Sequence, residues 1–352
     1  MNEILDSLET WLQRNERIAV ATVVDTWGSA PRPIGSKMAT TLSGGISGSV
    51  SAGCVENAVL EESKAVIKSG KPRLLSFGVA DDQAFEVGLA CGGTIKVFVE
   101  PFEALQGTYG VIKQHIAARE PMAVLSVVEG PDEWINRKLI VLTDERSEGD
   151  LILPEALRDR AVALALERLA QGVGGIEALD EGITLFVDVY PPVPRLIIVG
   201  AVHIADPLVT MANQAGFDTI IVDPRGAFNT RERFPHATAL IKEWPQKALA
   251  SMSLDHWAYV VVLTHDPKLD DPALQVALTS DARYVGALGS RRTNALRIER
   301  LRRAGLTEDQ LARLHAPVGL DLGGRSPAEI ALSIMAEIVR VKNGLPSRVA
   351  VS

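Results

Sequence analysis

The sequence predicts an α/β protein in which an N-terminal α+β domain precedes a Rossmann-like domain with a doubly wound parallel sheet. The Rossmann-like domain is predicted by three features near the middle of the chain. Residues 196–199 are all apolar, which is typical of a strand buried on both faces of a parallel sheet. Gly200 ends this run, and apolar spacing predicts a helix over residues 204–215. A second strand at 219–222 then leads to Asp223, and an acid roughly 20 residues after the glycine is typical of a nucleotide-binding βαβ unit.

The turn after the first of these strands departs from the dinucleotide-binding fingerprint. That fingerprint is Gly-x-Gly-x-x-Gly/Ala, and its middle glycine lets the backbone approach a pyrophosphate. Residues 200–205 are GAVHIA, so the branched Val202 takes the place of the middle glycine. The pattern therefore favours a Rossmann scaffold that binds no dinucleotide in the usual way.

Composition and charge exclude several classes of protein. The 352 residues are 47% hydrophobic and 23% charged, which is ordinary for a globular protein with two cores. A net charge of −8 argues against nucleic acid or an anionic membrane as the main partner. We expect no signal peptide and no membrane span, since no apolar stretch reaches roughly 18 residues. Two cysteines make no disulfide framework, so a reducing cytoplasm is expected, and no internal repeat is evident.

Residues 191–194, PPVP, stiffen the chain and predict the domain boundary. The N-terminal domain is therefore expected over residues 1–190 and the Rossmann-like domain over residues 191–352. Apolar periodicity in the first domain predicts strands at 18–26, 37–41, 46–51, 95–100, 122–128, 138–143 and 183–189, and helices at 4–12, 55–69 and 154–169.

Cys54 lies in the run GSVSAGCVE, residues 48–56, at the start of the helix expected from residue 55. The unpaired N–H groups and the dipole at a helix N-terminus favour a thiolate. The neighbouring Gly53 allows backbone amides to face a bound anion. The alternative interpretation is a small buried residue in a tight turn, and the local pattern supports both.

Cys91 lies in the run GLACGGT, residues 88–94, where Gly92 and Gly93 leave room for a ligand. The alternative is a hairpin in which the cysteine only fills space. Zinc is not expected, because neither cysteine has a Cys or His neighbour at the spacing of structural zinc sites. A Cys-His-Asp nucleophile has no local support.

In the C-terminal domain, polar side chains follow the expected strands at 219–222, 259–263 and 284–288. Ligands of open α/β sheets bind outside the carboxyl ends of the strands. This location makes candidates of Asp223, Arg225, Thr264, His265, Asp266, Ser290, Arg291 and Arg292. The last three residues open a helix and can bind a phosphate, or they form a helix cap with solvated arginines. The two histidines at this edge, His203 and His265, are candidate acid–base groups or structural residues.

Taken together, the motifs resemble the xanthine dehydrogenase accessory protein family of the XdhC/CoxI type over nearly the whole chain. The resemblance is carried by GSVSAGCVE at 48–56, ACGG at 90–93, residues 192–205, LTHD at 263–266, GALGSRRT at 286–293 and HAPVGLD at 315–321. The family usually has glycine where this chain has Ala52, and a second glycine where it has Val202.

The resemblance implies a cytoplasmic maturation chaperone with no catalytic residue of its own. Such a protein binds molybdenum cofactor (molybdopterin) as cargo and holds it while an oxo ligand is exchanged for a sulfido ligand. It then delivers the cofactor to a xanthine dehydrogenase-type molybdenum hydroxylase. A cysteine desulfurase and a second copy of the chain, in a homodimer, are further expected partners.

We expect the cargo site to use cysteines of the first domain and anion contacts of the second. Cys54 and Cys91 are candidate contacts to molybdenum or sulfur, because soft metals prefer thiolate ligands. The other expected cofactor-binding residues are Gly53, Gly92, Gly93, Gly200, His203, Asp223, His265, Asp266, Ser290, Arg291 and Arg292. The alternative function is an NAD(P)-dependent oxidoreductase, in which Asp223 binds the ribose and His203 or His265 transfers a proton.

Overall fold

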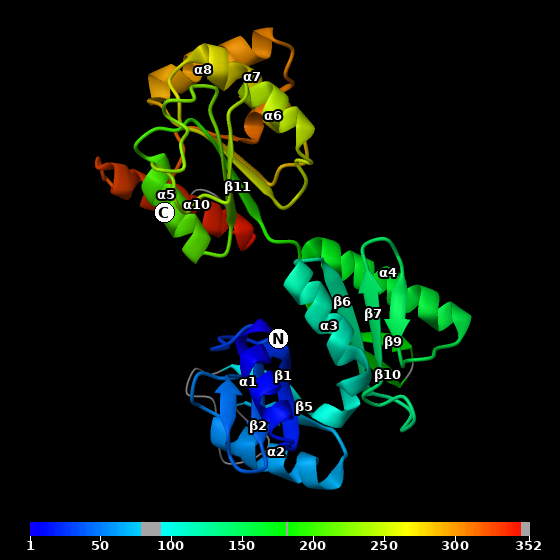
Figure 1. The fold of residues 1–352 in the computed structure, drawn as a ribbon. Coiled ribbons are helices and arrows are strands. Elements are labelled where there is room, and N and C mark those ends of the chain that lie inside the picture. The colour runs from blue at the N-terminus through cyan, green and yellow to red at the C-terminus, as the bar shows by residue number, and fades with distance from the viewer. Residues whose placement is uncertain (79–92, 181, 346–352) are drawn as a thin grey trace. The chain divides into compact units, whose positions relative to one another are not determined.

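The computed structural model describes residues 1–78, 93–180 and 182–345 of the chain. The chain divides into two units, Met1–Pro192 and Val193–Ser352, next to the prolines at 191–194 (Figure 1). Among the described residues, no helix is long and apolar enough to cross a membrane.

The N-terminal unit contains two five-stranded antiparallel sheets. The first has the strand order β3-β2-β1-β5-β4 and the second the order β8-β7-β6-β10-β9. The first sheet and its helices are α1 (Leu5–Gln13), β1 (Ile18–Trp27), β2 (Lys37–Thr41), β3 (Ile46–Gly48), α2 (Glu56–Ser69), β4 (Arg73–Phe77) and β5 (Thr94–Pro101). The second sheet and its helices are α3 (Gln106–Ala118), β6 (Met122–Glu129), β7 (Lys138–Leu142), β8 (Ser147–Gly149), α4 (Glu155–Gln171), β9 (Gly175–Asp180) and β10 (Ile183–Tyr190).

These two sheets are copies of one structural motif. Each consists of a helix, three strands, a helix and two strands, joined in the same spatial order. We call residues 5–101 the first copy and residues 106–190 the second copy. Short sequence runs also recur: IAVATVVD in β1 matches MAVLSVVE in β6, and VFVE in β5 matches LFVD in β10. The expectation that the chain has no internal repeat is therefore wrong.

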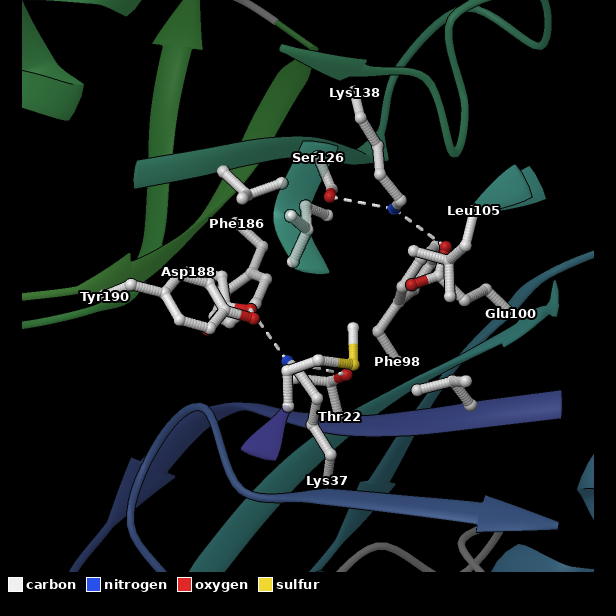
Figure 2. A pocket seen from close by; sticks show the side chains of 14 residues that line it. Thr22, Lys37, Phe98, Glu100, Leu105, Ser126, Lys138, Phe186, Asp188 and Tyr190 are labelled. Atoms are coloured by element: carbon white, nitrogen blue, oxygen red, sulfur yellow. Dashed lines mark hydrogen bonds and ion pairs between the residues drawn. The ribbon is translucent and has the colours of Figure 1, made fainter. Parts of the chain in front are cut away.

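A buried, charged joint connects the two copies (Figure 2). Lys37 opens β2, and its ammonium pairs with the Asp188 carboxylate of β10 at 2.8 Å. Lys138 opens β7 in the same way and pairs with Glu100 of β5 at 2.8 Å. The two lysine side chains are only 4% and 1% exposed. Each copy thus supplies the lysine for the other copy's acid.

Further side chains complete this joint in matching positions. Lys37 donates to the hydroxyl of Thr22 at 3.3 Å, and Lys138 donates to that of Ser126 at 3.0 Å. Phe98 and Phe186, also equivalent in the two copies, lie beside the pairs (Figure 2). The cavity that remains is about 20 Å³, which holds about one water molecule. The joint is therefore a packed core and not a ligand pocket.

The C-terminal unit is built on a six-stranded parallel sheet with the order β13-β12-β11-β14-β15-β16. Its elements are β11 (Arg195–Val199), α5 (Ala205–Gln214), β12 (Asp218–Val222), β13 (Ala239–Ile241), α6 (Pro245–Ser251), β14 (Ala258–Val262), α7 (Pro267–Leu278), β15 (Tyr284–Ala287), α8 (Arg291–Arg303), α9 (Glu308–Ala312), β16 (Leu314–His315) and α10 (Pro327–Lys342). Side chains of β11 alternate between two cores, one shared with α5 and α10 and the other with α6 and α7. This is the doubly wound Rossmann arrangement that the sequence predicts.

Candidate functional site

Cys54 lies in a tight turn directly before α2, and its side chain is half-buried. It packs on the core that the first sheet forms with α2. Ala52 and Gly53 in this turn have positive φ angles of 56° and 116°. A left-handed backbone favours glycine, so it suits Gly53 and is strained at Ala52.

The polar groups of this turn face a carboxylate of the chain itself. Glu56 accepts hydrogen bonds from the backbone N–H groups of Ser51 and Gly53, both at 2.8 Å. It also accepts from the hydroxyls of Ser49 and Ser51. Burial raises the pKa of Glu56, but these hydrogen bonds outweigh it and hold the pKa at about 2. The N–H groups of Ser51 and Gly53 already donate to Glu56, so they are not free to bind an anion. The thiol of Cys54 is therefore the better candidate for a ligand contact in this turn.

Cys91 and the glycine that follows it lie outside the described residues. Gly93 is buried just before β5, where an added Cβ would lie 2.5 Å from the carbonyl oxygen of Ser29. Gly93 therefore touches the loop after β1, and only glycine fits there. Ala30 of the same loop packs on the core cluster that contains Cys54. Gly93 thus borders the loop after β1, and this loop and the Cys54 turn pack on the same core.

The candidates of the C-terminal unit lie at one edge of its sheet. Gly200, Asp223 and residues 264–266 and 288–292 follow β11, β12, β14 and β15, and parallel strands share their carboxyl edge. Gly200 has a φ of 113°, and a Cβ there would lie 2.5 Å from Cγ2 of Thr264. The turns after β11 and β14 are therefore in contact, as the strand order predicts.

Asp223 is 1% exposed, and its neighbours use both carboxylate oxygens. The N–H of Ala201 donates to Oδ2 at 2.8 Å. Arg225 donates from its backbone N–H and Nε to Oδ1, each at 2.9 Å, and from a terminal nitrogen to Oδ2 at 2.7 Å. Burial raises the pKa of Asp223, but Arg225 and Ala201 outweigh it and lower the pKa. A ribose would have to displace this guanidinium, which disfavours the interpretation of Asp223 as a ribose ligand.

The remaining polar candidates are helix caps or exposed side chains. Asp266 accepts from the N–H of Lys268 at 3.0 Å, and Ser290 accepts from the N–H of Thr293 at 3.1 Å. These two residues cap α7 and α8, which satisfies N–H groups at the helix starts. The exposed candidates are His203, His265, Arg291 and Arg292. The start of α8 is thus a capped helix with two exposed guanidiniums.

A buried ion pair that the sequence did not indicate supports this edge. Asp270 of α7 pairs with Arg297 of α8 at 2.7 Å, and both side chains are nearly inaccessible. Arg297 also donates to the carbonyl oxygen of Leu288 at 3.0 Å, and Asp270 accepts from the Thr264 hydroxyl. Burial outweighs these contacts and raises the pKa of Asp270. The network joins the ends of β14 and β15 to two helices.

A second buried network holds the loop after β16. Glu337 of α10 accepts from the Tyr284 hydroxyl at 2.5 Å and from the N–H of Gly319 at 2.8 Å. His315 Nδ1 lies 3.2 Å from the same carboxylate. The partners are distant in the chain, so no local pattern in the sequence could reveal either network.

Two family models match this chain. The model described as the XdhC Rossmann domain matches residues 196–338, and that of the XdhC and CoxI family matches residues 11–78. The first covers most of the C-terminal unit, and the second covers β1 to β4 with the Cys54 turn. The chain belongs to the XdhC and CoxI family.

Relatives of this XdhC/CoxI chain align with it over nearly its whole length. It is 29% identical to a probable xanthine dehydrogenase subunit of Bacillus subtilis, over 95% of this chain and 96% of that protein. It is 26% identical to the molybdenum cofactor insertion chaperone PaoD of Escherichia coli, over 94% and 85% of the two chains. A crystal structure of a xanthine dehydrogenase from Bacillus halodurans matches with a TM-score of 0.70 and 26% identity, over 99% and 97% of the two chains. The expected family and fold are confirmed.

Proposed function

We propose that this chain is a cytoplasmic maturation chaperone for a molybdenum hydroxylase of the xanthine dehydrogenase type. It binds molybdenum cofactor as cargo, holds it while a sulfido ligand is installed, and releases it to the hydroxylase. The similarity to a relative named as a molybdenum cofactor insertion chaperone, over 94% of this chain, supports this assignment.

The structural observation that carries the proposal is the Cys54 turn. Glu56 fixes the turn by accepting four hydrogen bonds from its backbone and hydroxyl groups. The thiol beside it is half-buried, so it is neither part of the inner core nor freely solvated. A soft molybdenum–dithiolene centre prefers a thiolate over oxygen ligands. We assign Cys54, together with Cys91, to the metal or sulfur end of the cargo.

The phosphate end of the cargo requires cationic or amide donors. The exposed guanidiniums of Arg291 and Arg292 at the start of α8 are suited to this contact. The proposal also retains Gly53, Gly92, Gly93, Gly200, His203, Asp223, His265, Asp266 and Ser290 as residues near the cargo. For Asp223 that role acts through Arg225, since its own oxygens are already hydrogen-bonded.

Anaerobic binding of released molybdenum cofactor to the purified chain tests the proposal. After unbound cofactor is removed by ultrafiltration, we expect molybdenum and pterin to be retained in equal amounts. Cys54→Ala and Cys54→Ser should both lose retention, because serine keeps the size of the side chain but is a hard ligand. Cys91→Ala should weaken retention as well.

A matched control comes from the second copy, where Ile152 is 84% exposed in the loop before α4. Ile152→Ala should retain as much cofactor as the unaltered chain. The midpoint of thermal unfolding should be the same for every variant as for the unaltered chain. Full retention of cofactor by Cys54→Ala and by Cys91→Ala would remove the thiolate role. Saturable NADPH binding without cofactor retention would favour the oxidoreductase alternative.

A cysteine desulfurase as sulfur donor and a homodimer belong to the same proposal. Co-purification of the chain with a desulfurase, and its mass measured by light scattering, test these two points. A monomer that inserts cofactor into apo-hydroxylase would exclude the homodimer and leave the chaperone assignment intact.

A further inference from the structure

The segment after β12 presents two guanidiniums and an aromatic ring at the carboxyl edge of the C-terminal sheet. The Phe228 side chain is 48% exposed. Its ring centroid lies 5.0 Å from Cζ of Arg225 and 5.7 Å from Cζ of Arg233. The buried Asn229 anchors the segment by donating to the carbonyl oxygen of Ile241 at 2.9 Å. The exposed Arg225 and Phe228 and the half-buried Arg233 are therefore held on a fixed backbone.

Asp223 orients the guanidinium of Arg225 toward this edge. Two of the five N–H groups of that guanidinium donate to the carboxylate in a fork, at 2.9 Å and 2.7 Å. The other three have no acceptor among the residues that the structure describes, and the side chain is 44% exposed. Arg225 is thus pre-oriented and retains N–H groups for a ligand.

Arg233 adds a second positive charge that no described carboxylate neutralises. One of its terminal nitrogens donates to the carbonyl oxygens of Ala201 at 3.2 Å and Phe228 at 2.8 Å. These bonds leave Nε and the other terminal nitrogen without a described acceptor. Asp266 lies within electrostatic range of Arg225, and the Lys242 side chain lies beside Gly226. The segment after β12 therefore carries or contacts three cations, Arg225, Arg233 and Lys242.

The usual anion position of a Rossmann unit, at the start of the helix after the first strand, is poorly equipped here. The first turn of α5 carries the acidic Asp206. Pro207 has no N–H, and the N–H of Ala205 already donates to the carbonyl oxygen of Val202 at 3.0 Å. The positive charge lies instead after the second strand, where Rossmann proteins contact the 2′ position of a ribose.

We propose that Arg225 and Arg233 bind a phosphate monoester at the carboxyl edge of the C-terminal sheet. Asp223 is the positioning residue for Arg225 and not itself a ligand group. Guanidinium forks match the oxygens of a phosphate and bind them in pairs. A nucleoside 2′-phosphate and the terminal phosphate of a pterin both supply this chemistry. The assignment rests on the C-terminal unit alone and does not depend on the proposed function.

Calorimetric titration of the full chain with inorganic phosphate tests the site. Arg233→Gln should weaken binding by roughly 10- to 100-fold, because a charged hydrogen-bond donor is lost. The double variant Asp223→Asn/Arg225→Gln should weaken it similarly without leaving a buried, unpaired carboxylate. Arg302→Gln/Arg303→Gln removes two positive charges from the last turn of α8 and is the matched control, which should bind phosphate normally.

Several outcomes would overturn the assignment. These are absence of phosphate binding by the unaltered chain, normal binding by both the Arg225 and the Arg233 variants, or a loss confined to the Arg302 and Arg303 control. Thermal unfolding of each variant separates a lost site from a lost fold. The titration uses inorganic phosphate and no molybdenum cofactor, so a failure of the chaperone proposal would leave its result unaffected.

The same titration distinguishes the two sources of phosphate. Tighter binding of adenosine 2′-phosphate than of adenosine 5′-phosphate or inorganic phosphate would assign the site to a nucleotide. No preference for the 2′-phosphate, with cofactor retention that depends on Arg233, would assign it to the pterin and would replace Arg291 and Arg292 as the phosphate contact of the cargo. Either result upholds the phosphate site.

Discussion

The two copies in the N-terminal unit share a scaffold, but both cysteines belong to the first copy. The loop before α2 contains Cys54, whereas the loop before α4 ends in Pro154. The connection between β4 and β5 spans residues 78–93 and includes Cys91, whereas residues 181–182 join β9 to β10. The family model for residues 11–78 likewise matches the first copy. The thiolate contacts that we propose for the cargo therefore belong to the loops of the first copy.

What the copies have in common lies at their joint. Each copy has a buried lysine whose partner is an acid of the other copy, Lys37 with Asp188 and Lys138 with Glu100. A buried charge without its partner is costly, so neither copy can satisfy its own charges alone. The pairing fixes how the two sheets face each other, which explains why these residues recur while the loops diverge.

The largest expected effect comes from breaking one of these pairs. Lys138→Met should lower the free energy of unfolding by about 3–5 kcal/mol, because it leaves Glu100 buried and unpaired. Lys37→Met should cost about 1 kcal/mol less, since Asp188 also accepts from the Tyr190 hydroxyl at 2.8 Å. Urea denaturation, followed by a spectroscopic signal of the N-terminal unit, measures both values.

The double variant Glu100→Leu/Lys138→Met is the control for this comparison. Replacing both charges with apolar side chains of similar size should recover most of the lost stability. If the double variant is as unstable as Lys138→Met, packing and not unpaired charge would explain the loss. Equal effects of the two lysine variants would contradict the role given to Tyr190.

Glu56 and Glu155 are the first residues of the equivalent helices α2 and α4. The second-largest effect on stability is expected from replacing Glu56, and the same change at Glu155 is its control. Glu56→Gln should cost about 1–2 kcal/mol at pH 7, a value reduced for the solvent screening of a partly exposed carboxylate. Glu155→Gln should cost little, because Glu155 is exposed and opens a helix with no such turn.

The cost of losing Glu56 should depend on pH in a defined direction. Its pKa is lowered from 4.5 to about 2 on folding, so the charged form stabilises the folded state. That contribution is complete above pH 4.5 and is lost as the pH falls toward 2. The free energies of unfolding of the unaltered chain and of Glu56→Gln should therefore converge as the pH falls over this range. A constant difference from pH 7 down to the lowered pKa would refute the role of the Glu56 charge.

The strands of the C-terminal unit were predictable, because buried parallel strands are continuous apolar runs such as residues 196–199. The repeat in the N-terminal unit was missed. Only short runs recur in it, and the loops between them differ in length, so no single offset aligns the copies. Lys37 and Lys138 could have revealed it, since each opens a strand that follows a Val-Val-acid run.

The site was predictable in position more than in chemistry. Strand order alone places Gly200, Asp223 and Ser290 at one edge of a parallel sheet. The sequence could not show that the Arg225 guanidinium donates to both oxygens of the Asp223 carboxylate, because an arginine two residues away can equally face solvent. Nor could it show that Glu56 accepts hydrogen bonds from the backbone N–H groups of Ser51 and Gly53. Such contacts depend on side-chain orientation, which periodicity and spacing do not determine.

The smallest expected effect tests the backbone of the Cys54 turn, which the second copy does not reproduce. Ala52 has a φ of 56°, a strained value for a residue with a Cβ. Ala52→Gly should relieve about 1–2 kcal/mol of this strain and cost up to about 1 kcal/mol through the greater entropy of the unfolded chain. A net stabilisation of about 0.5–1 kcal/mol is expected in urea denaturation. Ala30→Gly, in the nearby loop without a positive φ, should instead destabilise the chain, and the same sign for both variants would contradict the strain at Ala52.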